Sequence, residues 1–440
     1  MSSHEINGGP LQLDSGLIRG SVTGPEDSIS VYKGIPFAAP PIGALRWKPP
    51  APVEPWLGIR PAREFGPAAQ QGISNFGGIN GKVWQDEDCL YLNVWTPARS
   101  LDEKLPVMVW IHGGGFGIGA GSNPGYDGTR LAGMGVVLVS INYRLNILGA
   151  FAHPLLTRES EHHASGNYGL MDQVAALEWV QRNISAFGGD PNQVTIFGES
   201  AGSRSVTLQS ISPLSKGLFK RGICQSGAAR EVSMSLEDRE KQGVKAAEKL
   251  GASTLDELRS KSYADIASAL GIWEDPIGAF NSNPMVDGWM IPEDPRDMYA
   301  SGKINDVSLM MGINADEGTL MLGRTRIKTV EDFTGFVRHQ YGGDADKVSA
   351  LYAPDSDDAV YEALNHHHTD SSMTLHARKQ ARWMEQAGLT SFFYYFTRIP
   401  PTPAGKSLGP ITARKFHMSL GFMDGWRTSS RKPTTSSHRP

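Results

Sequence analysis

The chain reads Val194-Thr195-Ile196-Phe197-Gly198-Glu199-Ser200-Ala201-Gly202 at the point that decides its fold. A short β-favouring run passes directly into the pattern Gly-x-Ser-x-Gly, and a helix can begin at the serine. In such a strand-turn-helix, small residues flank a serine on a sharp turn, so that its hydroxyl projects above a sheet. The following helix directs its positive end at any negative charge formed there. The stretch predicts Ser200 as a nucleophile; the plainer alternative is a glycine-rich turn with a capping serine.

A second glycine-rich loop, His112-Gly113-Gly114-Gly115-Phe116, follows the apolar run Pro106-Val107-Met108-Val109-Trp110-Ile111. Consecutive glycines let backbone N–H groups converge where side chains would block the approach. This arrangement suits an oxyanion hole, which stabilises the negative charge that acyl transfer places on a carbonyl oxygen. The alternatives are a phosphate-binding loop or a merely flexible one, and no Lys-Ser/Thr pair follows the glycines as a nucleotide loop requires.

The rest of the chain alternates predicted strands and helices. Residues 106–111 and 136–141 are continuous apolar runs bounded by glycine, which is typical of parallel strands buried on both faces. A helix is predicted over 170–185, with Asp172, Gln173, Gln181 and Arg182 facing outward. A strand at 307–312, a helical stretch at 359–387 and a strand at 392–396 follow. With short antiparallel strands expected before about residue 94, the pattern predicts an α/β fold with a mostly parallel central sheet flanked by helices.

Composition narrows the classes of partner. The 440 residues are enough for one large α/β unit, and 42 Lys plus Arg against 46 Asp plus Glu leave a net charge of −4 without basic blocks. We therefore expect neither nucleic acid nor a membrane as a partner. The N-terminus shows no secretory pattern and only two cysteines are present, Cys89 and Cys224, so we expect a reducing, cytoplasmic location. The oligomeric state stays open.

Several ordered blocks resemble the type-B carboxylesterase and cholinesterase-like family of the α/β-hydrolases. The blocks are Tyr32-Lys33-Gly34-Ile35-Pro36-Phe37, Leu45-Arg46-Trp47, Glu87-Asp88-Cys89-Leu90-Tyr91-Leu92-Asn93-Val94, Asn142-Tyr143-Arg144, Gly166-Asn167-Tyr168-Gly169, Phe187-Gly188-Gly189-Asp190-Pro191 and Gln225-Ser226-Gly227-Ala228. Together with the two glycine motifs they cover most of the chain in family order. The resemblance implies a hydrolase that acts on small-molecule carboxylic esters through an acyl-serine intermediate and needs no cofactor.

The resemblance also assigns roles to residues. It implies that Ser200 is the nucleophile, that Gly114, Gly115 and Ala201 supply the oxyanion N–H groups, and that Glu317 orients the base. Nucleophile, acid and base follow one another in this order along the chain. From the residues alone Asp316 is equally eligible as the acid, and a solvated acidic turn is the alternative. Glu199 is expected to be a buried carboxylate that shapes the field of the site.

Two departures from the family stand out. The family pairs the cysteine corresponding to Cys89 with one shortly upstream, where this chain has Phe65-Gly66-Pro67-Ala68-Ala69, so we expect Cys89 to be free. The family also carries its catalytic histidine in a late His-Gly-Ala-Glu-type block, which residues 409–421 do not match. His417 is the one histidine nearby, although the residues around it resemble no catalytic turn.

A frameshift near Pro410 would explain the missing block. Residues 411–421 can be back-translated so that reading one base earlier gives Tyr-His-Gly-Ala-Glu-Ile-Pro-Tyr-Val-Phe-Gly, with the histidine at about Ile411 or Thr412. On this hypothesis residues 1–409 form a single α/β-hydrolase domain whose C-terminal part is incomplete, and 410–440 are an aberrant, disordered tail. The loss of covering helices would expose apolar surface and lower solubility.

Other interpretations remain at this stage. A catalytically impaired or dead cholinesterase-like binding protein is the main alternative, and a nonfunctional gene product is another. His366-His367-His368 suggests a metal cluster, but successive helical residues point about 100° apart, which disfavours one shared ion. Met310-Met311 is expected to pack in the core of its strand.

Overall fold

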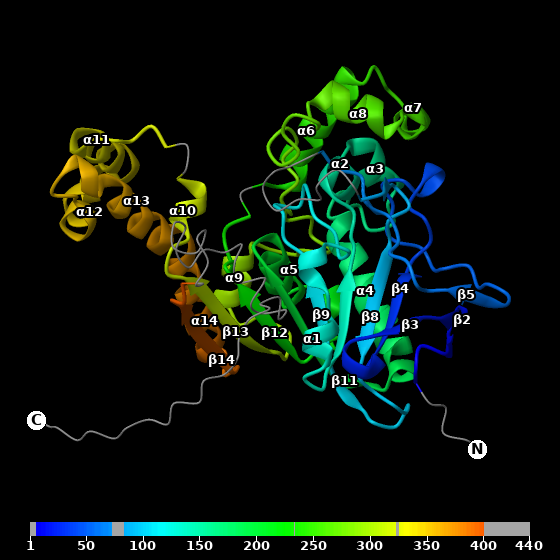
Figure 1. Ribbon diagram of the computed structural model, residues 1–440. Helices are drawn as coiled ribbons and strands as arrows, with labels where there is room; N and C mark the ends of the chain where they lie inside the picture. The colour runs from blue at the N-terminus through cyan, green and yellow to red at the C-terminus, as the bar shows by residue number, and fades with distance from the viewer. Residues whose placement is uncertain (1–5, 73–82, 233, 323–324, 400–440) are drawn as a thin grey trace, which may run out of the picture.

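The computed structural model describes residues 6–72, 83–232, 234–322 and 325–399, and its centre is one twisted sheet (Figure 1). The strand order is β14-β13-β12-β11-β9-β10-β8-β4-β3. The bounds of these strands are β3 Ser21–Thr23, β4 Ile29–Pro36, β8 Tyr91–Thr96, β9 Leu105–Ile111, β10 Val137–Ile141, β11 Gly189–Glu199, β12 Arg221–Gln225, β13 Ser308–Asn314 and β14 Ser391–Phe396.

Strand direction divides the sheet into two parts. From β10 through β9, β11, β12 and β13 to β14, every neighbouring pair is parallel. The early strands β8, β4 and β3 continue the sheet antiparallel. β10 is buried along its whole length and β9 over Val109–Ile111, as the continuous apolar runs at 136–141 and 106–111 predicted. The α/β-hydrolase class expected from the sequence is therefore confirmed.

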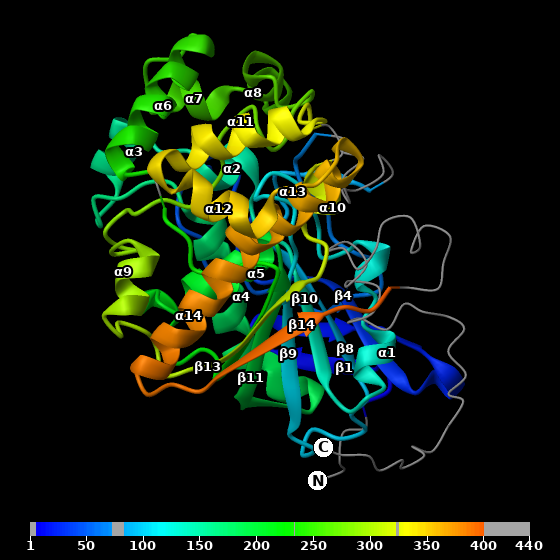
Figure 2. The same cartoon turned by 90° about the vertical axis from the view of Figure 1, so that its left-hand side faces the viewer.

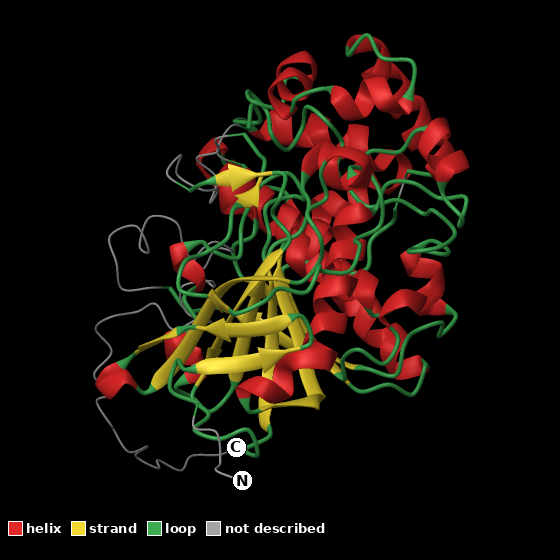
Figure 3. Ribbon diagram, turned by 90° about the vertical axis from the view of Figure 1, so that its right-hand side faces the viewer, coloured by secondary structure: helices red, strands yellow, loops and turns green. Residues whose placement is uncertain are grey.

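Helices pack around this sheet and beyond one end of it (Figure 3). Their bounds are α1 Thr129–Ala132, α2 Asn146–Ala150, α3 Pro154–Glu159, α4 Tyr168–Asn183, α5 Ala201–Gln209, α6 Leu236–Lys249, α7 Leu255–Ser260, α8 Tyr263–Leu270, α9 Pro295–Ala300, α10 Gly318–Met321, α11 Val330–Tyr341, α12 Ala345–Tyr352, α13 Val360–His368 and α14 Leu375–Gln386. Two smaller sheets contain β1 Pro10–Leu13, β2 Gly16–Arg19 and β5 Ile59–Pro61, and β6 Ala68–Ala69 and β7 Gln85–Asp86.

The helical stretch expected over 359–387 is one continuous helical path. A π-helical segment, Thr369–Thr374, joins α13 to α14. Figure 2 shows α14 running beside the sheet, where it packs on β13 and β14, while α13 leads away from it. There α11, α12 and α13 bury a small core of their own around Phe333, Val337 and Leu364.

The prediction for helix α4 was wrong at two residues. Asp172 and Gln173, expected to face outward, are fully buried. Asp172 accepts hydrogen bonds from Nε and Nη2 of Arg144 at 2.8 and 2.7 Å, and Gln173 donates to Ser205 Oγ at 3.0 Å. Apolar spacing alone cannot show that the polar face of a helix meets a polar layer inside the protein.

The expectation that both strand methionines are core residues was also wrong for one of them. Met311 is buried, but Met310 is 41% exposed. On β14, which borders β13 at the end of the sheet, Phe392, Phe393 and Tyr395 are 58%, 42% and 53% exposed. Within the described residues, this end of the sheet therefore carries an exposed apolar surface.

Both cysteines, Cys89 and Cys224, are buried and free; the free state was predicted for Cys89. The expected boundary at residue 409, the tail 410–440 and His417 lie outside the described residues, so these remain predictions. Within the described ranges, no helix is long and apolar enough to cross a membrane.

Candidate active site

Ser200 lies on the sharp turn between β11 and α5. Its backbone has φ 53° and ψ −117°, and its N–H donates to the Gln225 carbonyl at 2.9 Å. A Cβ atom added at Gly202 would lie 2.0 Å from the Ile111 carbonyl oxygen, so only glycine lets α5 start this close to β9. A non-glycine residue in such a strained conformation is what Gly-x-Ser-x-Gly predicts for a nucleophile.

The glycine-rich loop after β9 lies against this turn. A Cβ atom at Gly113 would be 3.3 Å from Ser200 Cβ and 2.8 Å from Glu199 Oε2. Gly114 and Gly115 have φ values of 108° and 62°, which favour glycine. Among the described residues, no group accepts a hydrogen bond from the N–H of either glycine. The structure thus brings the loop that carries the predicted oxyanion residues against the turn of the predicted nucleophile, through Gly113.

His112 and Tyr143 hold the start of this loop. The Tyr143 hydroxyl donates to the His112 carbonyl at 2.8 Å, and the two rings stack with their centres 4.3 Å apart. His112 Nδ1 is 2.8 Å from the Gly113 carbonyl oxygen. Burial lowers the pKa of His112 to about 4, because the ring cannot be hydrated when charged. A neutral histidine therefore orders the loop without adding charge to it.

Glu317 lies at the end of β13 and is 3% exposed. Its Oε1 accepts hydrogen bonds from Ser226 Oγ at 2.6 Å, from the Asn314 backbone N–H at 2.8 Å and from Asn314 Nδ2 at 3.1 Å. Its backbone N–H donates to Thr369 Oγ1 at 3.1 Å. These contacts fix the carboxylate next to the loop after β12, whose Gly227 packs against the backbone of Ser200.

Asp316, the other eligible acid, has a different environment. Its Oδ1 accepts a hydrogen bond from Asn365 Nδ2 of α13 at 2.8 Å. It is more exposed than Glu317 and has no described contact with the loops after β11 or β12. The geometry therefore favours Glu317 for the role that the family resemblance implies.

The base is the part of the constellation that the described residues do not supply. No histidine in these ranges hydrogen-bonds to Ser200, and His417 lies outside them. His368, at the end of α13, lies near Glu317 and Arg230. Burial and the Arg230 charge lower the pKa of His368, and together they outweigh the Glu317 charge, which raises it. His366 and His367 have other neighbours: His366 faces Glu362 at 3.9 Å, and His367 Nε2 lies 2.6 Å from the Tyr341 hydroxyl.

In the described part of the chain, no three His, Cys, Asp or Glu side chains could hold a metal ion.

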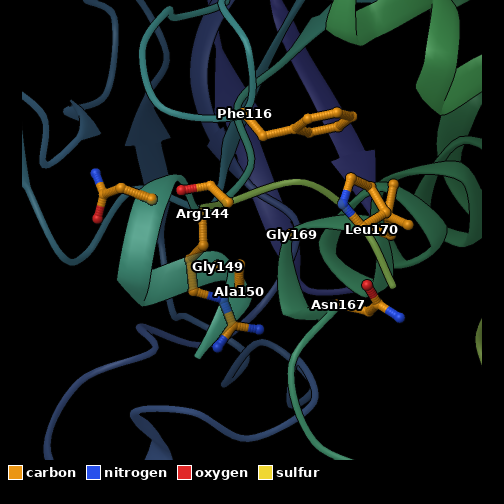
Figure 4. Close-up of a pocket in the computed structure, with 10 residues that line it drawn as sticks. Phe116, Arg144, Gly149, Ala150, Asn167, Gly169 and Leu170 are labelled. Carbon is orange, nitrogen blue, oxygen red and sulfur yellow. The ribbon is translucent and has the colours of Figure 1, made fainter. Parts of the chain in front are cut away.

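A small cavity lies beneath the glycine-rich loop (Figure 4). It measures about 20 Å³, room for about one water molecule, and Phe116, Arg144 and Asn167 are among its lining residues. Figure 4 shows Phe116 on one side of it and Asn167 on the other. The buried Nη1 of Arg144 has no partner among the described residues, so an ordered water here would satisfy it.

Sequence reasoning missed several polar residues of the site. No role was predicted for Ser226 or Asn314, yet both donate to Glu317. Their position directly after β12 and β13 was the available signal, because the carboxyl ends of adjacent parallel strands meet at one edge of a sheet. His368 carried no such signal, because it lies at the end of a helix, α13, and its place near Glu317 depends on how segments far apart in the chain pack.

Comparisons with known proteins agree with this geometry. The model of the Carboxylesterase family matches residues 9–419. Fumonisin B1 esterase of Sphingopyxis macrogoltabida is 39% identical over 390 residues, which cover 87% of this chain and 70% of that protein. Para-nitrobenzyl esterase of Bacillus subtilis is 39% identical over 347 residues, covering 77% and 69% of the two chains. A solved structure of a PNB esterase superimposes with a TM-score of 0.79 at 33% identity, covering 96% of this chain and 86% of the other. The chain therefore belongs to the carboxylesterase family of serine hydrolases, which has the α/β-hydrolase fold.

Proposed function

We propose that this chain hydrolyses small-molecule carboxylic esters through an acyl intermediate on Ser200. The observation that carries the proposal is the contact between the strained turn at Ser200 and a glycine-rich loop whose Gly114 and Gly115 N–H groups have no described acceptor. Unpaired donors beside a nucleophile are the arrangement that a developing oxyanion needs. Ester hydrolysis is also what the names of the relatives state for those proteins.

The proposed reaction has two stages. Ser200 Oγ attacks the ester carbonyl carbon as its proton passes to a general base, and the N–H groups of Gly114, Gly115 and Ala201 stabilise the oxyanion. The C–O bond to the alcohol then breaks, and the base returns the proton to the leaving alcohol. Water, deprotonated by the same base, releases the acid and regenerates Ser200. Glu317, held by Ser226 and Asn314, would orient the base.

The identity of the base stays open between two candidates. The chain as written offers His417, whereas the frameshift hypothesis places a histidine at about residue 411 or 412. Without a base the serine hydroxyl is a weak nucleophile, and loss of a triad member costs several orders of magnitude in rate. The chain as written and a chain with the restored frame should therefore differ sharply in turnover if the frameshift is real.

A series of p-nitrophenyl esters of increasing acyl length tests the proposal on both chains. We expect hydrolysis by at least one of them, abolished by Ser200→Ala. A folded protein that hydrolyses no member of the series in either form would instead support the alternative of a binding protein, which the enzyme names of the relatives do not favour.

A further inference from the structure

Two arginines lie near the active-site loops, Arg204 beside Phe116 and Arg230 near Glu317, and neither serves the reaction proposed above. Arg204 lies one helical turn beyond Ser200 on α5. Its backbone N–H donates to the Ser200 carbonyl at 2.9 Å. Arg230 follows β12, in the loop that also carries Ser226. Neither guanidinium forms an ion pair with a carboxylate of the described residues. Partly buried cations without a directly paired carboxylate are costly, which makes them candidates for binding a ligand, although the nearby Glu317 charge partly offsets that of Arg230.

The side chain of Arg204 reaches back toward the catalytic turn. Helical side chains tilt toward the N-terminus of their helix, and residues four apart share a face, so Arg204 lies on the side of Ser200. Its Cζ is 6.0 Å from the centre of the ring of Phe116, the last residue of the glycine-rich loop. Its Nη1 donates to Asn283 Oδ1 at 2.8 Å, and its guanidinium makes no other hydrogen bond to a described residue.

Arg230 lies near Glu317, whose charge acts on its guanidinium. Its Nη2 contacts the Ser372 carbonyl and lies 2.8 Å from Met373 Sδ, which anchors the side chain to the π-helical segment. Its buried Nε has no hydrogen-bond acceptor among the described residues. The two arginines thus leave several N–H donors unused around one catalytic residue.

The neighbours of Arg230 experience a positive field. Burial and the Arg230 charge lower the pKa of Arg204 to about 10. The same two causes lower the pKa of His376 to about 4, with Lys379 and Arg296 adding to the effect. Glu317 is the carboxylate that opposes this field, and its Oε1 is already engaged by Ser226 and Asn314.

We infer that Arg204 and Arg230 form a carboxylate-binding subsite, and that the preferred substrates are esters that carry a free carboxylate a few bonds from the scissile carbonyl. A guanidinium offers paired donors that match a carboxylate, so both arginines select for this anion over a neutral ester group. The inference rests on the proposed ester hydrolysis for its substrate, but binding and turnover can be measured apart.

Binding is tested first, on the Ser200→Ala chain, which cannot turn over. Ethyl hydrogen glutarate and diethyl glutarate are titrated separately and followed by ligand-observed NMR. We expect the half ester to bind at least about tenfold more tightly, the effect of one hydrogen bond to a charged group. Arg204→Gln and Arg230→Gln should each reduce that preference, and Arg204→Lys should retain part of it. Arg182→Gln, at an exposed surface ion pair with Asp14, is the matched control and should keep the full preference.

Turnover then separates this inference from the proposed function. Two pairs of substrates are compared, each with one charged and one neutral member. The mono-p-nitrophenyl ester of glutaric acid and its methyl ester differ by a carboxylate on the acyl side. 3-Butyryloxybenzoate and its methyl ester differ by a carboxylate on the alcohol side. The subsite is supported if the enzyme prefers the charged member of either pair and if both arginine variants reduce that preference. The pair that shows the preference tells whether the subsite binds the acyl side or the alcohol side of the substrate.

Equal binding of the two glutarates, or a preference that survives both substitutions, overturns the inference, even if neutral esters are hydrolysed. If the half ester binds preferentially but nothing is hydrolysed, the subsite stands and the proposed function fails. Thermal unfolding of each variant shows whether it is folded, and Arg230→Lys, which keeps a cation at that position, replaces Arg230→Gln should the latter unfold.

Discussion

The Ser226 hydroxyl donates a 2.6 Å hydrogen bond to Glu317 Oε1, and this contact joins the loop after β12 to the loop after β13. Both residues are buried. The carboxylate that would orient the general base is therefore fixed by a neighbouring strand as well as by its own.

Replacing Ser226 with alanine should lower kcat/KM for ester hydrolysis by about tenfold or more, the effect of one hydrogen bond to a charged group. Steady-state kinetics on whichever form of the chain turns over, as written or frame-restored, measures this. Ser226→Thr keeps a hydroxyl and should recover part of the rate. Ser210→Ala, which removes a buried hydroxyl bonded within its own helix, is the control. Equal rates for Ser226→Ala and Ser210→Ala would show that the contact does not support catalysis.

Gly202→Ala should destabilise the fold by about 3 kcal/mol or prevent folding, because over-packing against a backbone atom cannot be relieved by a side-chain movement. The added Cβ would lie 2.0 Å from the Ile111 carbonyl oxygen. Gly335→Ala is the matched control: it lies in α11 with open space around it, and alanine there should stabilise by about 1 kcal/mol or less. Denaturant unfolding compares the two, and an unchanged midpoint for Gly202→Ala would contradict the geometry of the turn.

The buried pair of Arg144 and Asp172 should matter far more than a surface pair. Asp172→Ala leaves a buried guanidinium without its partner and should cost about 3–5 kcal/mol. Asp14→Ala breaks the exposed pair with Arg182 and should cost about 1 kcal/mol or less. The free energies of unfolding of the two variants, measured together, decide this, and similar losses would mean that Asp172 is not in the buried network.

Stability should fall with acidification through the buried, neutral His112. Its pKa is about 4 in the folded chain against 6.5 when unperturbed, so between these values the unfolded state binds the proton and the folded state does not. The contribution of the neutral ring to the free energy of unfolding is fully present above pH 6.5. It is lost as the pH falls toward 4, and the total loss is about 3 kcal/mol. Unfolding free energies of the parent and of His112→Asn between pH 7 and pH 4 test this. The variant should lose less stability than the parent, and parallel curves would count against a buried neutral ring.

The uncovered end of the sheet should make the chain self-associate. Phe392, Phe393 and Tyr395 are exposed on β14, next to the exposed Met310, and aromatic strands without charges pair readily with other chains. We expect concentration-dependent scattering that decreases in Phe392→Lys/Phe393→Thr. Leu351→Lys, at a 76% exposed leucine of α12, is the control and should change little. A monodisperse parent chain that unfolds cooperatively would contradict the prediction.

The sequence predicted the parts of the molecule that local patterns determine. The strand before Ser200, the glycine-rich loop and the parallel strands are each encoded by neighbouring residues, and the structure has them where they were expected. Asp172 and Gln173 were placed wrongly because burial of a polar helix face depends on Arg144 and Ser205, which are distant in sequence. Met310 was placed wrongly because an apolar strand does not show whether anything covers it. The arrangement of Arg204, Arg230 and His368 likewise depends on segments far apart in the chain.

Mass spectrometry after treatment with a fluorophosphonate tests the central claim most directly, because the reagent forms a P–O bond to an activated serine and releases fluoride. The account predicts one adduct, on the peptide that contains Ser200, in the frame-restored chain or in the chain as written, and none in Ser200→Ala. A folded chain that stays unmodified at Ser200 in both forms, or that is modified only at another serine, would contradict it.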